Sequence, residues 1–396
     1  MMLGGYDVCV LGGGVSGVSA VITMKRENPD IRVVIIEKTG DILKKLAASG
    51  NGRCNISNTK AKGFTAVSSF MYSMGVYLKS RDDGWVYPYS MRAETVVNAL
   101  KNELHSFDVD VVLNTEVCGV KKDDDGFSII CTHGKKEEST FTANAVCLAL
   151  GGKAAPKFGT VGDGFVIAKK IGLKVSPVYP VLTKINLEGI GDDLAGVRHD
   201  AEISLFHNDR LIVSETGQIQ FIRGGISGIA AFNLSKFIVI KDRNKSFRES
   251  MNEYDIVIDF FPDLSQQAFE NEFEAIKGQI CKKEDVQTHN IYRRVLRGFL
   301  DEKLANHIAK RAEEFAELNL KTLKYKVTGL GGWEQAQATG GGILKSEYDS
   351  RTRESKIKGL FVMGELLDGV YPCGGYNITQ AITTGIDAGR SIARLF

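Results

Sequence analysis

The stretch Tyr6-Asp-Val-Cys-Val-Leu-Gly-Gly-Gly-Val-Ser-Gly17 decides the fold of this chain. Its first six residues form a short apolar run, which predicts a buried parallel strand. Three of the glycines that follow have the spacing G-x-G-x-x-G. Residues 18–26 then favour a helix, and residues 31–36 favour a second buried strand. The order of strand, glycine turn, helix and strand predicts an α/β fold with a doubly wound parallel sheet.

Each glycine of the motif has a physical function in a dinucleotide-binding turn. Gly12 allows the tight turn, Gly14 lets the backbone approach a pyrophosphate, and Gly17 lets the helix lie close to the strand. The helix N-terminus offers free N–H groups and partial positive charge to the phosphates. Glu37 ends the second strand, where a carboxylate can accept hydrogen bonds from a ribose diol. The pattern predicts a dinucleotide other than NADP, since a carboxylate repels a 2′-phosphate, but it does not separate FAD from NAD.

Length and composition exclude several classes of protein. A chain of 396 residues with 43% hydrophobic content predicts two or three domains with a sizeable core. Fifty Lys and Arg against 48 Asp and Glu give a net charge of +2, which argues against a nucleic-acid partner. No run of 18 apolar residues and no signal peptide are present, so we expect a cytoplasmic protein without a membrane span. Seven scattered cysteines without C-x-x-C spacing predict neither a metal site nor a disulfide framework.

Two irregular stretches follow the second strand. Residues 43–58 are dense in Gly, Asn and Ser and contain Arg53, so backbone N–H groups and the guanidinium could continue the phosphate cradle towards a flavin. The alternative is a flexible surface loop. Residues 64–88 are aromatic and are predicted to be irregular. They could cover a planar ligand, although core packing is the simpler interpretation.

The next part of the chain returns to regular patterns. Residues 93–104 predict an amphipathic helix and 109–113 a strand. Three segments then predict an antiparallel meander, at 116–122, 126–131 and 139–144. A separate strand at 145–150 re-enters the parallel sheet and ends in Gly151-Gly152, as the crevice at the carboxyl ends of such a sheet requires.

The middle of the chain has a different sequence pattern from both ends. Residues 183–261 alternate in short stretches, at 201–206, 210–214, 218–222 and 254–260, and predict a β-rich insert, with a helix at 229–240. Residues 262–320 are polar, periodic and helical. Their cluster of Arg293, Arg294 and Arg297 is most simply a solvated helix face, with an acidic partner as the alternative.

The C-terminal block carries a second ligand signal. A buried strand at 359–365 ends in Glu365, a turn follows at 371–377, and residues 378–392 predict a helix. Gly374 and Gly375 leave the N–H groups at the start of this helix without nearby bulk. Aimed at the N1–C2=O edge of a flavin, these groups would stabilise the charge that forms on reduction. The alternative is a plain helix cap and turn.

Taken in order, these motifs resemble one family. Gly12-x-Gly14-x-x-Gly17 with Glu37, Ser49-Gly-Asn-Gly-Arg-Cys-Asn55, Ala149-Leu-Gly-Gly152, Thr339-Gly-Gly-Gly342, Gly364-Glu365 and Cys373-Gly-Gly-Tyr-Asn377 are similar to the YhiN-like or BaiN-like bacterial FAD-binding flavoproteins of the glutathione-reductase-type superfamily. The resemblance covers nearly the whole chain. It implies an FAD-binding domain at 1–184 and 339–396, with a β-barrel-like insert at 185–338 that contains a helical subdomain at about 262–320.

The resemblance also extends the set of expected ligand residues. Val117 would touch the adenine through its backbone, and Lys45 and residues 51–55 would line FAD. Together with the motif positions, the predicted cofactor-binding residues are Gly12, Gly14, Val15, Ser16, Gly17, Glu37, Lys38, Lys45, Ser49, Asn51, Gly52, Arg53, Cys54, Asn55, Val117, Gly151, Gly152, Gly364, Glu365, Gly374, Gly375, Tyr376, Asn377 and Ile378.

These expectations lead to a functional hypothesis. We expect an FAD-dependent oxidoreductase that transfers a hydride at flavin N5 to or from a small organic substrate. NAD(P)H, if it is used, would bind transiently, and O2 is the alternative electron partner. An RNA-modifying or RNA-binding flavoprotein and a flavoprotein with structural or sensory FAD are the other hypotheses. Cys54 and Cys373 could form a redox pair, but small residues in tight turns are the simpler interpretation. No catalytic acid or base stands out, and the sequence indicates neither substrate nor oligomeric state.

Overall fold

A computed structural model describes residues 2–134, 137–239, 250–251, 253–282, 288–314 and 319–396. The chain divides into two compact units, which we call unit 1 and unit 2. Unit 1 comprises Met1–Pro180 and Gln337–Phe396, and unit 2 is Val181–Ala336. The predicted boundaries were 184/185 and 338/339. The chain passes between the units at two short strands that pair with each other, β10 (Tyr179–Val181) and β17 (Ala338–Gly340).

Unit 1 is built on a seven-stranded mixed sheet. Its order is β6-β2-β1-β9-β8-β7, with β18 also paired to β9. The strands are β1 (Met2–Leu11), β2 (Val33–Ile36), β6 (Asp110–Val112), β7 (Thr115–Asp123), β8 (Gly126–His133), β9 (Glu137–Leu148) and β18 (Leu360–Val362). β1 pairs in parallel with both β2 and β9, so the two strands of the opening motif lie side by side. The predicted fold class is confirmed.

One predicted division is wrong. Residues 139–144 and 145–150 were expected to form separate strands, whereas β9 runs unbroken from Glu137 to Leu148. Its first half pairs antiparallel with β8, and its last residues pair in parallel with β18. No Gly or Pro interrupts the segment, so the backbone continues from the meander into the parallel sheet. The burial pattern changes along β9 because its neighbouring strand changes from β8 to β18.

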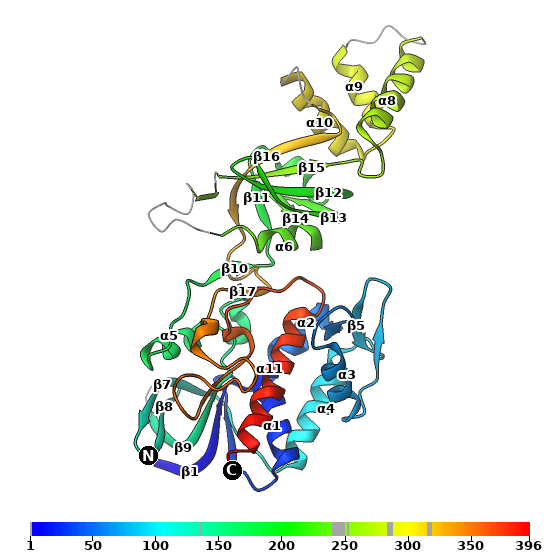
Figure 1. The fold of residues 1–396 in the computed structure, drawn as a ribbon. Helices are drawn as coiled ribbons and strands as arrows, with labels where there is room; N and C mark the ends of the chain where they lie inside the picture. Colours follow the sequence, from blue (N-terminus) through cyan, green and yellow to red (C-terminus); the bar gives the residue numbers. More distant parts are fainter. Residues whose placement is uncertain (1, 135–136, 240–249, 252, 283–287, 315–318) are drawn as a thin grey trace. The chain divides into compact units, whose positions relative to one another are not determined.

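The first and last helices of the chain lie side by side on this sheet (Figure 1). They are α1 (Val15–Glu27) and α11 (Tyr376–Ala393). Close packing depends on glycine, because a Cβ on Gly389 would lie 2.5 Å from the backbone oxygen of Ala20, and one on Gly385 would clash with that of Ser16. The small residues of α11 therefore bring both ends of the chain together.

The aromatic stretch expected to be irregular contains regular structure. It holds α3 (Phe64–Tyr72) and the hairpin of β4 (Leu78–Ser80) and β5 (Trp85–Pro88). With β3 (Ser57–Asn58) the hairpin forms a small sheet of order β3-β5-β4. Buried Val67 and Met71 give α3 an apolar face, which the aromatic composition had obscured.

Three further helices complete unit 1. They are α2 (Lys44–Gly52), α4 (Ala93–Ser106) and α5 (Asp163–Lys170). α2 is not regular throughout, because Ser49, Gly50 and Asn51 have non-helical backbone angles. Within the described ranges, every helix of the chain is too short or too polar to serve as a transmembrane span.

Unit 2 is a closed six-stranded barrel with helices. The barrel order is β11-β14-β13-β12-β15-β16. Its strands are β11 (Ile185–Leu187), β12 (Arg198–His207), β13 (Arg210–Ile222), β14 (Gly225–Ser227), β15 (Tyr254–Asp259) and β16 (Thr322–Leu330). The predicted segments 210–214 and 218–222 are one strand, β13. α6 (Ile229–Ser235) ends earlier than predicted, and Ile240 lies outside the described residues.

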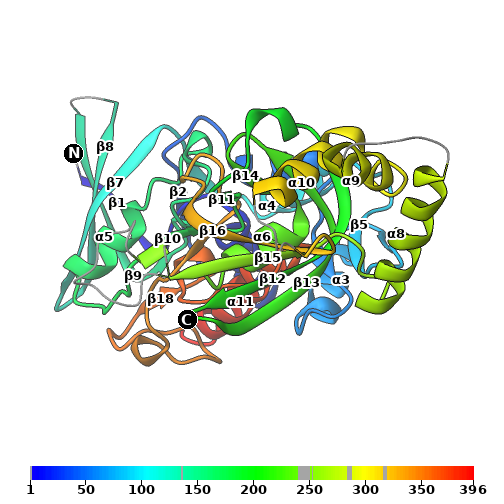
Figure 2. The same cartoon turned by 90° about the horizontal axis from the view of Figure 1, so that it is seen from above.

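The predicted helical subdomain is present in unit 2. It consists of α8 (Gln266–Cys281), α9 (Thr288–Leu296) and α10 (Glu302–Glu314). α9 contacts both of the other helices (Figure 2). Arg293 and Arg297 of the predicted cluster both pair with Glu302 at the start of α10. These two arginines therefore join neighbouring helices.

Candidate functional site

The glycine turn between β1 and α1 has room for a ligand at one position only. A Cβ on Gly12, whose φ is +105°, would lie 2.5 Å from the backbone oxygen of Ala149, and one on Gly17 would clash with that of Gly12. A Cβ on Gly14 would meet nothing closer than 4.0 Å. At positions 12 and 17 any side chain would clash with neighbouring backbone. Gly14 instead leaves open space, where the backbone can approach a phosphate.

The carboxylate of Glu37 lies against this turn. It accepts hydrogen bonds from the backbone N–H groups of Gly13 and Thr39, each at 2.8 Å. The predicted strand-terminal acid is thus held at the glycine turn, half-buried. The two N–H donors orient the carboxylate, and carboxylate lone pairs remain for the hydroxyls of a ribose.

The start of β7 lies beside Glu37 in space. The N–H of Thr115 donates to the backbone oxygen of Glu37 at 2.9 Å, which places Val117 two residues from this contact. Lys38 pairs with Glu116 at 3.1 Å and with Asp163 at 2.8 Å. Val117, the predicted adenine contact, is therefore close in space to Glu37, although the two lie far apart in sequence.

A second polar cluster joins four distant segments of unit 1. The ammonium of Lys45 lies 2.7 Å from Glu365 Oε2, and the N–H of Thr339 donates to Glu365 Oε1 at 2.9 Å. The hydroxyl of Thr339 accepts hydrogen bonds from the N–H groups of Lys153 and Ala154. A Cβ on Gly152 would lie 2.6 Å from Glu365 Oε1. Lys45, Gly152 and Glu365, predicted separately, are therefore neighbours.

Thr339 was quoted in a motif but was not among the predicted ligand residues. Its side chain caps the N–H groups after the strand end at Gly151-Gly152, while its own N–H orients Glu365. A hydroxyl residue directly before three glycines was the available signal. It was missed because its partners lie 185 and 186 residues away.

The N-terminus of α11 forms the other end of the site. Gly375, with φ of +92°, is its N-cap, and a Cβ there would clash with the backbone of Ser57. A Cβ on Gly374 would lie 2.6 Å from Trp85 Nε1. The first N–H groups of the helix, from Tyr376 to Ile378, have no intrahelical acceptor and carry partial positive charge. They are available to an electron-rich ligand edge.

Asn377 itself is used within the turn. Its amide nitrogen donates to the backbone oxygens of Tyr371 at 3.5 Å and Pro372 at 3.3 Å. Gly364 lies against α1, since a Cβ there would be 2.6 Å from the hydroxyl of Ser16. Asn377 therefore holds the turn before α11, and Ser16 at the start of α1 packs against Gly364.

The loop at 49–55 separates into exposed and buried positions. Asn51, Gly52 and Arg53 are exposed, whereas Cys54 and Asn55 are buried. With its side-chain nitrogen turned toward the small sheet, Asn55 donates hydrogen bonds to the backbone oxygens of Ser57 and Val86. The side chain of Asn55 thus anchors the loop to the small sheet, and the exposed residues remain available to a ligand.

The two cysteines of the redox hypothesis are both free thiols. Burial raises the pKa of the Cys54 thiol to about 12, which keeps it protonated near neutral pH. The thiol of Cys373 is buried beside the side-chain oxygen of Gln337 at 3.7 Å. A buried, protonated thiol is a poor redox nucleophile, which favours the structural interpretation of Cys54. Among the described residues, no group of three or more His, Cys, Asp and Glu could hold a metal ion.

Comparison with known proteins identifies a family and its relatives. The family described as HI0933-like protein Rossmann domain matches residues 63–391. A 3-dehydro-bile acid delta(4,6)-reductase of Clostridium scindens is 30% identical, over 97% of this chain and 98% of its own. A ribosomal RNA dihydrouridine synthase of Escherichia coli is 23% identical, over 95% of each chain.

A solved structure shares the fold. The 3-ketosteroid-delta4-(5alpha)-dehydrogenase of Rhodococcus jostii RHA1 superposes with a TM-score of 0.50 over 98% of this chain and 97% of its own. Its sequence is 13% identical to this one, so the likeness concerns the fold alone.

Proposed function

Because this chain belongs to the HI0933-like Rossmann-domain family and is an FAD-dependent oxidoreductase, we propose that it reduces a carbon–carbon double bond conjugated to a carbonyl group. The observation that carries the proposal is that both chain ends meet in unit 1, where Lys45 pairs with Glu365 and α1 packs against α11. We propose one elongated FAD site there, with Glu37 and the glycine turn at one end, the Lys45–Glu365 pair along it and the N-terminus of α11 at the other end.

FAD fits this site on three features of the structure. Open space at Gly14 admits a pyrophosphate to the N-terminus of α1. The carboxylate of Glu37 is held where it can accept hydrogen bonds from the adenosine ribose. Gly374 and Gly375 keep bulk away from the first N–H groups of α11, which would face the electron-rich edge of the flavin ring. Bound FAD would supply the hydride, and the residues of the chain would bind and orient the FAD.

The relatives support this choice of reaction class. The name of the Clostridium scindens relative describes a reductase that acts on double bonds of a 3-keto compound. Dihydrouridine, named for the Escherichia coli relative, differs from uridine by two hydrogens across a ring double bond that is conjugated to a carbonyl. For this chain we propose that a hydride adds to the β-carbon of the conjugated double bond and a proton to its α-carbon. We propose that NADH or NADPH provides the two electrons.

Two substrates remain candidates within this reaction class. The higher identity and the full coverage of the Clostridium scindens relative favour a small polycyclic enone. The Escherichia coli relative, which also matches almost the full length, favours a uracil base in ribosomal RNA. Both would present the same conjugated system to the flavin, so the residues of the FAD site do not separate them.

An anaerobic reduction experiment tests the proposal. The purified protein is mixed with NADH or NADPH while the visible absorbance of the flavin is followed, and a steroid 4-en-3-one or deproteinised ribosomal RNA is then added. We expect the absorbance to bleach and to return only with an acceptor that is itself reduced, as mass spectrometry of the product would verify. Flavin that neither nicotinamide reduces, or that neither acceptor reoxidises, would overturn the proposal.

A further inference from the structure

Unit 1 carries an unusual set of exposed aromatic rings, which we call the tyrosine face. It consists of Tyr72 at the end of α3 and of Tyr77 and Tyr89, which flank the β4–β5 hairpin. Their exposed fractions are 72%, 65% and 64%, higher than those of all other exposed large hydrophobic residues in the described part of the chain. An exposed aromatic patch of this kind typically marks a binding surface.

Two of these rings form a fixed platform with a cation above it. The N–H of Tyr89 donates to the backbone oxygen of Tyr77 at 2.8 Å, so the hairpin holds both residues in register. Their ring centroids lie 5.8 Å apart at 58°. The ammonium of Lys79 lies 5.7 Å from the centroid of the Tyr89 ring. Rings interleaved with cations are the arrangement on which bases of single-stranded nucleic acids stack.

The charge of this region contrasts with that of the whole chain. Residues 53–92 contain six Lys and Arg and only two Asp, a net charge of +4 against +2 for all 396 residues. The six cations, all exposed, are Arg53, Lys60, Lys62, Lys79, Arg81 and Arg92. The overall charge, which argued against a nucleic-acid partner, therefore conceals a local excess of positive charge.

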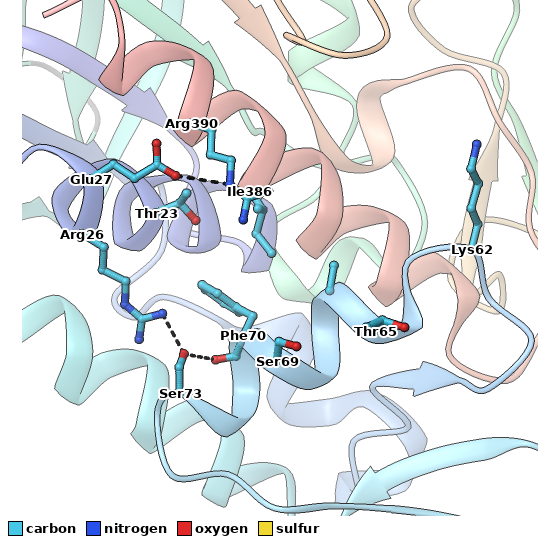
Figure 3. A pocket seen from close by; sticks show the side chains of 11 residues that line it. Thr23, Arg26, Glu27, Lys62, Thr65, Ser69, Phe70, Ser73, Ile386 and Arg390 are labelled. Carbon is cyan, nitrogen blue, oxygen red and sulfur yellow. Dashed lines mark hydrogen bonds and ion pairs between the residues drawn. The ribbon is translucent and has the colours of Figure 1, made fainter.

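A groove beside α3 continues this positive surface. It has a volume of about 610 Å³ and lies between α3, α1 and α11, with Lys62 and Arg390 in its lining (Figure 3). Arg26 lies in the groove, where Ser73 and Glu103 hold its guanidinium. Arg26 pairs with Glu103 and Arg390 pairs with Glu27, so Lys62 and the hydroxyls of the lining are the groups that a phosphate backbone could contact. Ser73, which lines the groove, directly follows Tyr72, so groove and tyrosine face adjoin.

The same small sheet contacts the flavin-ring end of the proposed site. Asn58 donates to the backbone oxygen of Gly374 at 3.1 Å, and the hydroxyls of Ser57 and Thr379 lie 2.8 Å apart. Trp85 packs against Gly374. The hairpin flanked by Tyr77 and Tyr89 therefore belongs to the same small sheet that contacts the helix start at Gly375.

We propose that the tyrosine face and the adjoining groove bind single-stranded RNA, with bases on Tyr77 and Tyr89 and phosphates along the groove. This inference rests on the proposed function, of which it selects the RNA substrate. Large exposed hydrophobic residues between 53 and 92 are all tyrosines, which stack against bases, whereas membrane-binding surfaces present Leu, Phe or Trp. Positive charge around the rings complements a polyanion and would repel another basic surface.

Fluorescence anisotropy with a labelled oligouridylate of about 12 nucleotides tests the proposal on the flavin-loaded protein. We expect Tyr77→Ala/Tyr89→Ala to weaken binding by about 30-fold or more, because two base-stacking contacts are lost together. Tyr77→Phe/Tyr89→Phe keeps the rings and should bind like the parent. Lys62→Glu/Lys79→Glu should lower the slope of log affinity against log salt by about 0.7 per cation. Leu211→Ala, an exposed apolar control in unit 2, should change nothing.

The readouts separate this inference from the proposed function. Reduction by NADPH reports on the flavin site alone, and it should be the same in the parent and in Tyr77→Ala/Tyr89→Ala. Binding that all four variants share, or no binding of the oligonucleotide by the parent at low salt, would overturn the RNA surface and leave the reductase proposal standing. Binding of anionic lipid vesicles in place of RNA would overturn it as well.

Discussion

The ammonium of Lys45 lies 2.7 Å from Glu365 Oε2, joining residues that are 320 positions apart. Lys45 belongs to α2 near the beginning of the chain, and Glu365 follows β18 near its end. The N–H of Thr339 holds the other oxygen of the same carboxylate. This contact closes the middle of the proposed FAD site, so both chain ends must be in place before the site exists.

Removing this ion pair should affect stability modestly and FAD binding more strongly. Both side chains are about a quarter to a third exposed, so we expect a coupling energy of about 0.5–1 kcal/mol from a double-mutant cycle of Lys45→Met and Glu365→Gln. Urea unfolding of the apoprotein measures it. The pair Lys101–Asp41, at the same 2.7 Å but on the surface, is the control and should show less coupling. Equal coupling in both pairs would contradict a special role for Glu365.

Glu37 should govern FAD affinity. Glu37→Ala removes the acceptor for Gly13 N–H and Thr39 N–H together with the expected ribose contact. Hydrogen bonds to charged groups contribute about 1.5–3 kcal/mol each, so we expect FAD to bind at least tenfold more weakly. Fluorescence titration of the apoprotein with FAD is the measurement. Glu94→Gln, an exposed change at the start of α4, should leave affinity unaltered, and unchanged affinity in Glu37→Ala would remove the ribose assignment.

The contact between α1 and α11 should tolerate no added methyl group. A Cβ on Gly385 would clash with the backbone oxygen of Ser16, so Gly385→Ala should lower the free energy of unfolding by about 1–3 kcal/mol and release FAD more readily. Gly278→Ala in α8 is the matched control. It meets open space on a helix, so it should stabilise the protein by up to about 1 kcal/mol. Thermal unfolding should move in opposite directions for the two variants, and the same direction would refute the packing argument.

Cysteine labelling should follow burial. At pH 8 the Cys54 thiol stays protonated, since burial raises its pKa to about 12, and its thiolate fraction grows only as the pH approaches that value. Iodoacetamide should therefore modify exposed Cys118 and Cys281 first and Cys54 only after unfolding, as peptide mass spectrometry would record. Cys54→Ser and Cys373→Ser should retain turnover. Rapid native labelling of Cys54 would reopen the redox-pair hypothesis.

Local patterns predicted most elements but not their limits. The alternation of apolar residues predicted a β-rich unit 2 but not its short strands β11 and β14, and two predicted segments proved to be the single strand β13. In unit 1, residues 64–88 hid α3 because aromatic composition masks a helical period. At the site, the motifs predicted Glu37 and Glu365, whereas Thr339 went unrecognised because its partners are distant in sequence.

By itself, the sequence determined the type and order of the elements, the glycine turn and the acid that ends β2. These features depend on interactions within a few residues, where burial period, backbone sterics and helix ends act directly. Only the tertiary structure decided that Lys45 meets Glu365, that α1 lies on α11, and that the small sheet β3-β5-β4 contacts the turn before α11. Such contacts join segments hundreds of residues apart, and they arise from how the sheet and helices pack as a whole, which no local pattern encodes.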